Sequence, residues 1–421
     1  MANTYLTRAN ASAPTLGTKF TFSVWVKLGV SSTTIDIFNQ PETTHVFCMM
    51  EIKPQLDVQL KNGSGTTYVR RRTNRQLRDI NGWYNLVLTY DSTLGTAEDR
   101  LKIFINGERQ SSWVDTTGTV DQNMVIPITA NTEDVRIGTN GAANSAFFNG
   151  SMSHLHFIDG LAYEASTFGS TDSTTGEWKI NTSPTISSYG NNGFLILKDG
   201  NTITDQSPNS NNLTLGGGTL TKTEDCPDNV FATINPLYKH SATYANGNLK
   251  STNASNKFGG VATIGVSTGK YYAEFKYGSA SNQNGAVGIY GNPQLASNNN
   301  QGVGKEANSY SYRSDDGYKV IENTSSSYGN TFASGDIIGI ALDLDNNKLY
   351  FSKNGTWQNS GVPTSGSTGT GSIPISLTPS DGCWFISANC NSASDTAIWE
   401  HNYGNGYFGT TAVSSAGTNA S

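Results

Sequence analysis

Short runs of alternating apolar and polar residues, joined by turns rich in Asn and Gly, constrain this chain more than any other feature. Residues 335–355 read GDIIGIALDLDNNKLYFSKNG, where Ile338, Ile340 and Leu342 share one face of a strand. Residues 82–107 repeat the arrangement, with an alternating strand, a turn, and a second strand that ends at Asn-Gly. Because side chains alternate between two faces only in a β-strand, both stretches predict β-hairpins.

The stretch at 335–355 also fits the start of a calcium-binding loop, because Asp343 and Asp345 are two residues apart. Such a loop needs Gly at its sixth position and a bidentate Glu at its twelfth. Counted from Asp343, these positions hold Lys348 and Asn354, so the hairpin is favoured. A partial ion site on the two aspartates remains an alternative.

Two tight turns are expected in this hairpin region. Asn346 and Asn347 separate the two strands, and Asn accepts the positive φ that both central positions of a type I′ turn require. Asn354-Gly355 forms a second turn of the same kind. Turn chemistry of this type is typical of antiparallel sheets.

The composition agrees with an all-β chain. Only 14% of the 421 residues are charged, against about a quarter in ordinary soluble proteins. Asn, Ser, Thr and Gly take their place, and no long stretch repeats apolar residues at helical spacing. The net charge of −6 and the pI near 5.4 argue against nucleic acid as a partner. No apolar run approaches the roughly 20 residues of a membrane span, so no membrane insertion is expected.

The N-terminal sequence and the cysteines indicate where the protein is made. MANTYLTRANASAPTLG has no basic segment followed by an apolar run, so we expect no signal peptide. Cys48, Cys226, Cys383 and Cys390 show neither CxxC nor zinc spacing, so we expect inert thiols in a reducing cytosol. No cofactor is expected.

The strand pattern occurs twice and predicts two sandwiches. FTFSVWVKL at 20–28 opens the pattern in the first half, and YYAEFKYG at 271–278 opens it in the second. The region between them is rich in Ser, Thr, Asn and Gly, and we interpret it as a connecting segment packed on the first domain. The expected division is 1–169, 170–235 and 236–421, with a boundary near Asn235-Pro236.

These stretches carry a family resemblance. YLTRANASA, FTFSVWVK, GWYNLVLTYD, RLKIFING and FIDGLAYEASTFG resemble a laminin-G-like (concanavalin A-like) jelly roll. NGNLKST, STGKYYAEFKY, GDIIGIALDLDNNKLYFSKNG and WFISANC are similar to a SPRY domain. Their order, with ITDQSPNSNN and CPDNVFATINPL between them, resembles virion proteins of marine tailed bacteriophages. The resemblance implies two concanavalin-like jelly-roll β-sandwiches in tandem.

The resemblance also implies a function, although fold alone does not give one. We expect a non-enzymatic structural protein on the virion surface, made in the host cytoplasm, as tail fibre or receptor-binding protein or as capsid decoration. Its partners are expected to be other virion proteins and further copies of itself, with a host surface glycan or protein as an additional candidate. The alternative is a cellular carbohydrate-binding or adhesion module.

Catalytic and metal-binding patterns are weak. Glycoside hydrolases of related folds need paired carboxylates on one strand face, and no Glu-x-Asp-x-Glu spacing occurs. None of the five histidines lies in a nucleophile motif, so no enzyme is expected. His154 and His156 are expected on one strand face and are two of the ligands that a metal would need. Because no third ligand is near them in the sequence, no metal is expected.

One cluster of positive charge is a candidate contact with a neighbouring subunit or an anion. Residues 69–79 read VRRRTNRQLRD, which contains Arg70, Arg71, Arg72, Arg75 and Arg78. Arginine forks suit phosphate, acidic glycans or carboxylates of another chain. The alternative is a solvated hairpin whose arginines alternate between faces and protect a sheet edge from pairing.

One aromatic stretch is a candidate ligand site. Residues 307–329 read ANSYSYRSDDGYKVIENTSSSYG, and tyrosine offers rigid, amphipathic contact area. SYSYRS equally fits an ordinary alternating strand, with DDG as its turn. The candidate ligand residues, with the exposed Trp that follows an Asn-Gly turn, are Tyr310, Tyr312, Asp315, Asp316, Tyr318 and Trp357.

Overall fold

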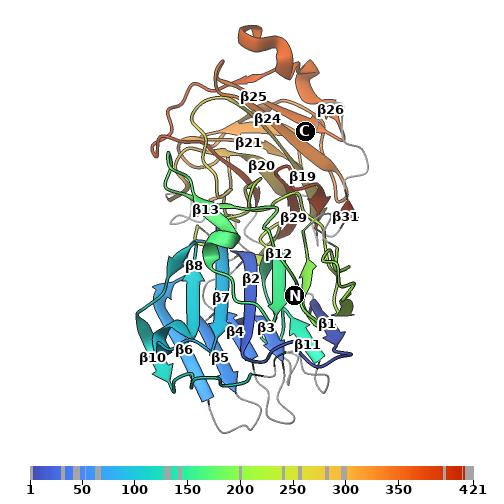
Figure 1. The fold of residues 1–421 in the computed structure, drawn as a ribbon. Helices are drawn as coiled ribbons and strands as arrows, with labels where there is room; N and C mark the ends of the chain where they lie inside the picture. Colours follow the sequence, from blue (N-terminus) through green and yellow to red (C-terminus); the bar gives the residue numbers. More distant parts are fainter. Residues whose placement is uncertain are drawn as a thin grey trace. The chain divides into compact units, whose positions relative to one another are not determined.

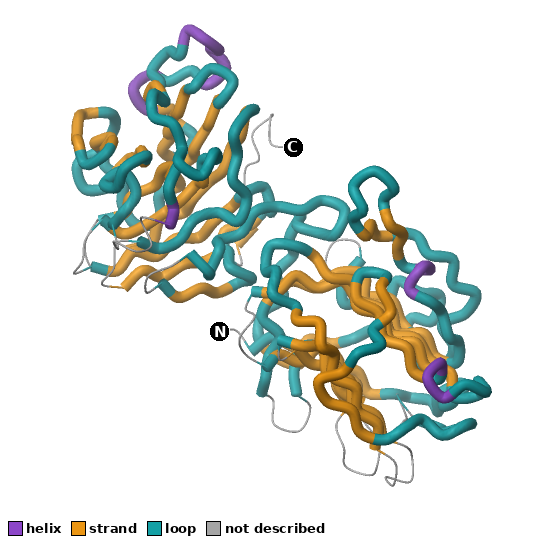
Figure 2. Tube along the Cα trace, turned by 90° about the vertical axis from the view of Figure 1, so that its left-hand side faces the viewer, coloured by secondary structure: helices purple, strands orange, loops and turns teal. Residues whose placement is uncertain are grey.

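The computed structural model consists of β-strands and short turns (Figure 2). It describes residues 3–29, 34–40, 48–52, 54–61, 68–126, 128, 134–140, 145–198, 202–238, 242–254, 258–279, 284–294, 301–391, 395–409 and 411–412. Two compact units divide the chain, residues 1–222 with 226–230 and residues 223–225 with 231–421. No helix in the described ranges is long and apolar enough to cross a membrane. The predicted all-β class is confirmed.

The first unit is a sandwich of two antiparallel sheets. Its strands are β1 (Tyr5–Ala9), β2 (Lys19–Leu28), β3 (Ile35–Gln40), β4 (Cys48–Ile52), β5 (Gln55–Lys61), β6 (Tyr68–Gln76), β7 (Trp83–Asp91), β8 (Leu101–Ile105), β9 (Glu108–Arg109), β10 (Trp113–Thr117), β11 (Asp134–Ile137), β12 (Gly150–Asp159), β13 (Gly169–Thr171), β14 (Trp178–Ile180), β15 (Phe194–Ile196) and β16 (Thr214–Gly217). One sheet has the order β10-β6-β5-β4-β3-β11-β1-β16, and the other has the order β15-β12-β2-β7-β8-β9, while β13 and β14 pair only with each other. Figure 1 shows β8, β7, β2 and β12 side by side in one layer.

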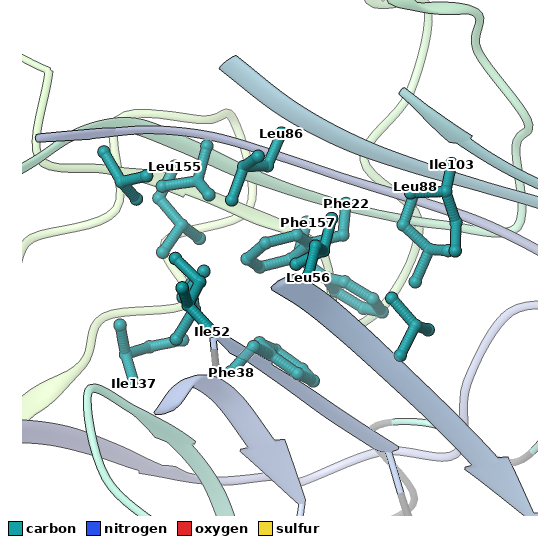
Figure 3. Packing of buried hydrophobic residues seen from close by; sticks show 14 of the residues in the cluster. Phe22, Phe38, Ile52, Leu56, Leu86, Leu88, Ile103, Ile137, Leu155 and Phe157 are labelled. Carbon is teal, nitrogen blue, oxygen red and sulfur yellow. The ribbon is translucent and has the colours of Figure 1, made fainter. Parts of the chain in front are cut away.

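The core of the first unit lies between these two sheets. Phe22 on β2 meets Phe38 on β3 edge to face, with ring centroids 5.0 Å apart, and Phe157 on β12 stacks on Phe38 at 5.8 Å. Figure 3 shows these rings packed with Leu56 and other aliphatic side chains from both layers. Each fully buried ring of this kind stabilises the fold by about 1.5–3 kcal/mol.

The segment after β12 covers the face of the six-stranded sheet that is turned away from the core, and it adds a strand to each sheet. Thr21 on β2 donates its hydroxyl to the carbonyl of Leu161 and accepts the N–H of Tyr163. Phe168 and Tyr189 are buried on the same face. Further along, β15 pairs with β12, and β16 pairs with β1. Residues well beyond 169 therefore complete the first sandwich.

The second unit is also a sandwich. Its strands are β17 (Thr243–Ala245), β18 (Lys250–Ala254), β19 (Lys270–Ser279), β20 (Gly285–Tyr290), β21 (Ser309–Arg313), β22 (Tyr318–Ile321), β23 (Thr324–Ser327), β24 (Ile337–Asp343), β25 (Lys348–Lys353), β26 (Thr356–Trp357), β27 (Ile373–Pro374), β28 (Phe385–Cys390), β29 (Thr396–Asn402), β30 (Tyr407–Phe408) and β31 (Thr411–Ala412). One sheet has the order β17-β18-β29-β19-β24-β25-β26, with β27 against β25, and the other has the order β23-β22-β21-β20-β28, while β30 and β31 pair only with each other.

Short 3₁₀ turns are the helical elements among the connections. They are η1 (Ala97–Asp99), η2 (Ala165–Thr167), η3 (Gln358–Ser360) and η4 (Pro363–Thr368). The last two belong to the segment that follows β26, which covers Tyr350 on β25. This cover matters for the candidate site described below.

The stretch at 335–355 is the β24–β25 hairpin, but its first turn differs from the prediction. Asp343 pairs with Lys348, so four residues form the loop instead of two, and of the two asparagines only Asn347 has a positive φ. The Asp343 carboxylate accepts the backbone N–H of Asn346 at 3.1 Å and its side-chain amide at 2.9 Å, which closes the wider turn. Asn354-Gly355 is confirmed as a tight turn, with φ of 48° and 78°.

Candidate functional site

The arginine cluster lies on β6, except for Arg78 just after this strand, and is bonded within its own sheet. Arg70 places Nε 3.0 Å from Oδ1 of Asp57 on β5, and its Nη1 is 2.6 Å from Oδ2 of Asp115 on β10. The hydrogen bonds to Asp57 raise the pKa of Arg70. Arg71 donates to the backbone carbonyls of Thr117 and Gly118, and burial lowers its pKa.

The other three arginines each have a polar partner nearby. Arg72 donates to Gln55 Oε1 at 3.1 Å, and Arg78 Nε donates to Gln76 Oε1 at 2.6 Å. Arg75 forms an ion pair of 2.7 Å with Glu108, whose side chain is mostly exposed. The interpretation of this strand as a protected sheet edge is wrong, because β10 pairs with β6 on its outer side.

The two tyrosines of SYSYRS face the core of the second unit and are fully buried. The ring of Tyr310 meets Trp384 with centroids 5.6 Å apart, and its hydroxyl accepts the N–H groups of Ser376 and Leu377. Tyr312 packs on Phe351 and donates its hydroxyl to the carbonyl of Asn330. The prediction that these two rings contact a ligand is therefore corrected, because alternation along β21 turns both of them inward.

The DDG turn beside them is held together locally. Arg313 forms ion pairs with Asp315 at 3.6 Å and with Asp316. Asp316 also accepts the backbone N–H of Tyr318 at 2.9 Å. The Tyr318 ring is 39% exposed at the start of β22, so it remains available at the surface.

Trp357 is brought together with two tyrosines that are distant in the sequence. Its ring meets Tyr272 on β19 at a centroid distance of 6.3 Å and an interplanar angle of 66°. It meets Tyr350 on β25 at 6.4 Å and 77°. Tyr350 is buried beneath this contact, whereas Tyr272 is 51% exposed. The three rings lie on the outer face of the eight-stranded sheet of the second unit, and we call Tyr272, Tyr350 and Trp357 the aromatic corner.

A carboxylate borders the aromatic corner. The Tyr272 hydroxyl donates to Glu274 Oε1 at 2.8 Å, and the Asn402 amide approaches the other oxygen at 3.5 Å. Partial burial, and then the charge of Glu274, raises the pKa of Tyr272, so the phenol stays protonated and can donate this bond. Between the rings the sheet carries Gly339, where a Cβ would lie only 2.8 Å from the Tyr272 hydroxyl.

Tyr272 and Glu274 were not predicted from the sequence, although a signal was present. Ala273, Phe275 and Tyr277 alternate along β19 and face the core, so the residues between them must face outward. The spacing could not show that Trp357 would cross two strands to reach Tyr272. That contact depends on the β24–β25–β26 register, in which Gly339 pairs with Ser352, and Ser352 pairs with Trp357.

The two histidines on β12 do not form a pair of metal ligands. A bulge between Ser153 and His156 gives His154 a φ of 47° and breaks the alternation on which the shared face depended. His156 lies 2.9 Å from the Tyr189 hydroxyl through Nδ1, and burial lowers its pKa to about 3. Among the residues whose positions are described, no group of three or more His, Cys, Asp or Glu side chains is arranged to hold a metal.

Comparison with known families identifies both sandwiches. Residues 1–166 match the model of the concanavalin A-like lectin/glucanases superfamily of the laminin-G type, and residues 253–380 match the SPRY domain. Ran-binding protein 9 of Danio rerio is 38% identical over 93 residues, which cover 22% of this chain and 15% of that protein. Ran-binding protein 9 of Homo sapiens has the same identity, over 12% of its length.

Solved structures resemble parts of the chain at low identity. The SPRY domain of human HERC1 is 18% identical and has a TM-score of 0.29, and the match covers 40% of this chain and 97% of that one. The heptameric SAP-like pentraxin of Limulus polyphemus is 13% identical with a TM-score of 0.29, over 52% of this chain and 90% of that one. The predicted order of a laminin-G-like domain followed by a SPRY domain is confirmed by the family models.

Proposed function

We propose that this chain, a laminin-G-like domain followed by a SPRY domain, is a non-enzymatic binding protein on the surface of a tailed bacteriophage particle. The tandem of two sandwiches of binding type supports this proposal more than any other observation. Two histidines within the described residues have structural roles. His156 and His401 are buried, and burial lowers the pKa of each to about 3, so neither is poised to transfer a proton near neutral pH.

The virion assignment rests on the order of the two domains and on the connector between them. The ITDQSPNSNN part of the connector folds around Asp205, whose carboxylate accepts the N–H groups of Leu195, Ser207 and Asn211. This network attaches the connector to β15 of the first sandwich. In this proposal the protein is made in the host cytoplasm and binds other virion subunits and further copies of itself, as a tail fibre or as capsid decoration.

The two units have different roles in the proposal. The first unit docks on the particle through Arg72 and Arg75 on β6 and through Arg78, which follows this strand. The second unit faces solvent or the host surface and presents its exposed aromatic side chains. Rim charges of this kind direct association and orientation more than they add affinity.

The location of the protein on intact particles tests the proposal. Electron cryomicroscopy of the purified phage is expected to show density for two sandwiches on the capsid or the tail. Density would also separate decoration from fibre, because a fibre projects from the tail and decoration covers capsid subunits. Particles without any such density, in a preparation where the protein is absent by mass spectrometry, would contradict a virion role.

A cellular carbohydrate-binding or adhesion module is the second candidate function. The 38% identity of one segment to vertebrate Ran-binding proteins favours it, since those are cellular proteins. In that case the protein is expected in cell fractions and on cell surfaces instead of on particles. The same fractionation therefore decides between the two functions.

A further inference from the structure

We propose that the aromatic corner of the second unit, with Glu274 beside it, is a binding site for an uncharged hexose unit of a glycan. The site lies on the outer face of the β19–β24–β25–β26 sheet, away from the 307–329 stretch that the sequence pattern favoured. This inference rests on the proposed binding function, and it gives that function a location and a ligand class.

The shape of the site is an angle between two rings. Tyr272 and Trp357 stand at 66° to each other, so one ring offers its face while the other offers its edge to the same ligand. Tyr350 meets the Trp357 ring at 77° and is buried, so it supports the Trp ring instead of contacting a ligand. The Tyr350 hydroxyl in turn lies 3.4 Å from Ser365 in η4. A side chain supported in this way loses little conformational freedom on binding.

The part of the sheet that lies beneath the site carries small residues. Gly339 and Ala341 are the outward-facing residues of β24 between Tyr272 and β25, by their pairing with Ser352 and Tyr350. A side chain at 339 would collide with the Tyr272 hydroxyl and with Ser352. The glycine thus allows the phenol to lie across β24 toward Trp357. The same arrangement leaves the exposed part of the Tyr272 ring free for contact.

Glu274, the polar side chain that contacts the ligand in this proposal, is held in position by a hydrogen bond. Glu274 Oε1 accepts the Tyr272 hydroxyl at 2.8 Å, which leaves the carboxylate with further acceptor capacity. Hydrogen bonds from hydroxyl groups to a carboxylate are short and about twice as strong as neutral ones. A pyranose ring has an apolar C–H face that packs on an aromatic ring and hydroxyl groups at its rim. It therefore matches a ring and a carboxylate placed side by side.

The charges around the corner favour an uncharged ligand. Lys270 and Lys276 share the outer face of β19 with Tyr272 and Glu274, because the strand alternates. A cationic ligand, which aromatic rings also attract, meets the positive charge of Lys276, whereas Lys270 is paired with Asp343 at 3.5 Å. An anionic ligand meets Glu274 at the centre of the site. A neutral polyol is the chemistry that encounters neither repulsion.

A saccharide titration of the full-length protein tests the inference. The probes are tetrasaccharides built from glucose, galactose, mannose or N-acetylglucosamine, at up to about 10 mM, which detects dissociation constants in the millimolar range. Wild-type protein is expected to bind at least one of them by calorimetry. Tyr272→Ala and Trp357→Ala are each expected to weaken that binding by at least about tenfold. Glu274→Gln is expected to weaken it less, since the amide keeps one acceptor but loses the charge.

Tyr271→Ala is the matched control. Tyr271 is the preceding residue on β19, is 41% exposed, and points to the opposite face of the sheet. Its change is expected to leave saccharide affinity within about twofold, well under one tenfold step. Binding of none of the probes by the wild-type protein overturns the inference, as does equal loss in Tyr271→Ala and Tyr272→Ala. Unfolding curves of every variant confirm that the second unit remains folded.

Particle incorporation of the same variants separates this inference from the proposed function. Incorporation of Tyr272→Ala at the wild-type level with loss of saccharide binding supports both. Incorporation without saccharide binding by the wild-type protein contradicts the hexose site alone. Saccharide binding through Tyr272 by a protein that is absent from particles contradicts the virion role alone.

Discussion

The guanidinium of Arg70 forms an ion pair with the carboxylate of Asp57, which is fully buried on β5 of the first sandwich. Arg70 Nε lies 3.0 Å from Oδ1 and 3.2 Å from Oδ2, and Nη2 contacts Oδ2 as well. On its other side Arg70 reaches Asp115 on β10. One arginine thus compensates a buried charge and ties three neighbouring strands together.

Loss of Arg70 is expected to destabilise the first unit strongly. Arg70→Ser removes the bidentate partner of Asp57, and breaking a buried pair from one side costs about 3–5 kcal/mol. Arg75→Ser removes an exposed ion pair with Glu108, which contributes about 0–1 kcal/mol. Urea unfolding of the two variants measures the difference. Similar free energies of unfolding for both would show that the Asp57 pair is not stabilising.

The docking role of the cluster is expected to depend on Arg72, Arg75 and Arg78. Changing all three to Ser is expected to weaken incorporation into particles, and the remaining incorporation is expected to fall further as salt is raised. Arg70 and Arg71 are left intact because their loss would disturb the sheet itself. Incorporation is measured by adding purified protein to particles that lack it. Incorporation equal to the wild type at every salt concentration would place the docking surface elsewhere.

Acid is expected to destabilise both units through their buried histidines. Burial lowers the pKa of His156 and of His401 to about 3, whereas an unfolded histidine has a pKa near 6.5. The unfolded chain therefore binds protons that the folded chain does not. The stability associated with each neutral ring is fully present above about pH 6.5 and is lost as the pH falls toward 3.

The slope of stability against pH measures this effect. Each buried histidine contributes about 1.4 kcal/mol per pH unit between about pH 4 and 6. His401→Gln is expected to remove that slope from the unfolding of the second unit, even if the variant is less stable at pH 7. Its ring contacts Ser251 and Tyr403, both within the same unit. An unchanged slope would mean that His401 is protonated in the folded protein.

The hydroxyl of Tyr310 is expected to stabilise the second unit instead of binding a ligand. Tyr310→Phe leaves the N–H groups of Ser376 and Leu377 without their acceptor, which costs about 1–3 kcal/mol in the free energy of unfolding. Tyr318→Phe is the control, because the Tyr318 ring is 39% exposed and its hydroxyl forms no hydrogen bond with another described residue. Denaturation of both variants, followed by the second unit, checks the prediction. A neutral Tyr310→Phe substitution would contradict it.

Local patterns in the sequence were sufficient to predict strands and tight turns, but they did not show which face of a strand is buried. Alternation predicted β24 and β25, and Asn354-Gly355 adopts the predicted positive φ values. The same alternation placed Tyr310 and Tyr312 on one face without showing that this face is the core. The four-residue loop after Asp343 was not predicted. It depends on the hydrogen bonds from Asn346 to the Asp343 carboxylate, which the spacing of residues does not show.

Contacts between distant strands were the part that sequence patterns could not supply. The edge position expected for β6 depended on which strand lies outside it, and β10 is separated from β6 by three strands in the sequence although the two are neighbours in the sheet. The aromatic corner likewise combines Tyr272 with Trp357, which meet only because β24 and β25 bring them into register. Long-range pairing of this kind determines the surface on which any site is built.

The two units are expected to fold independently and to divide docking from presentation. Each has its own apolar core, one around Phe22 and Phe38 and the other around Phe275 and Trp399. Residues 1–222 and residues 223–421, expressed separately, are therefore each expected to unfold in one cooperative transition. Residues 1–222 are expected to bind particles that lack the protein, since they carry the arginines of β6, and residues 223–421 are not. Binding by the second fragment alone would reverse the assignment, and binding by neither would mean that docking needs both units.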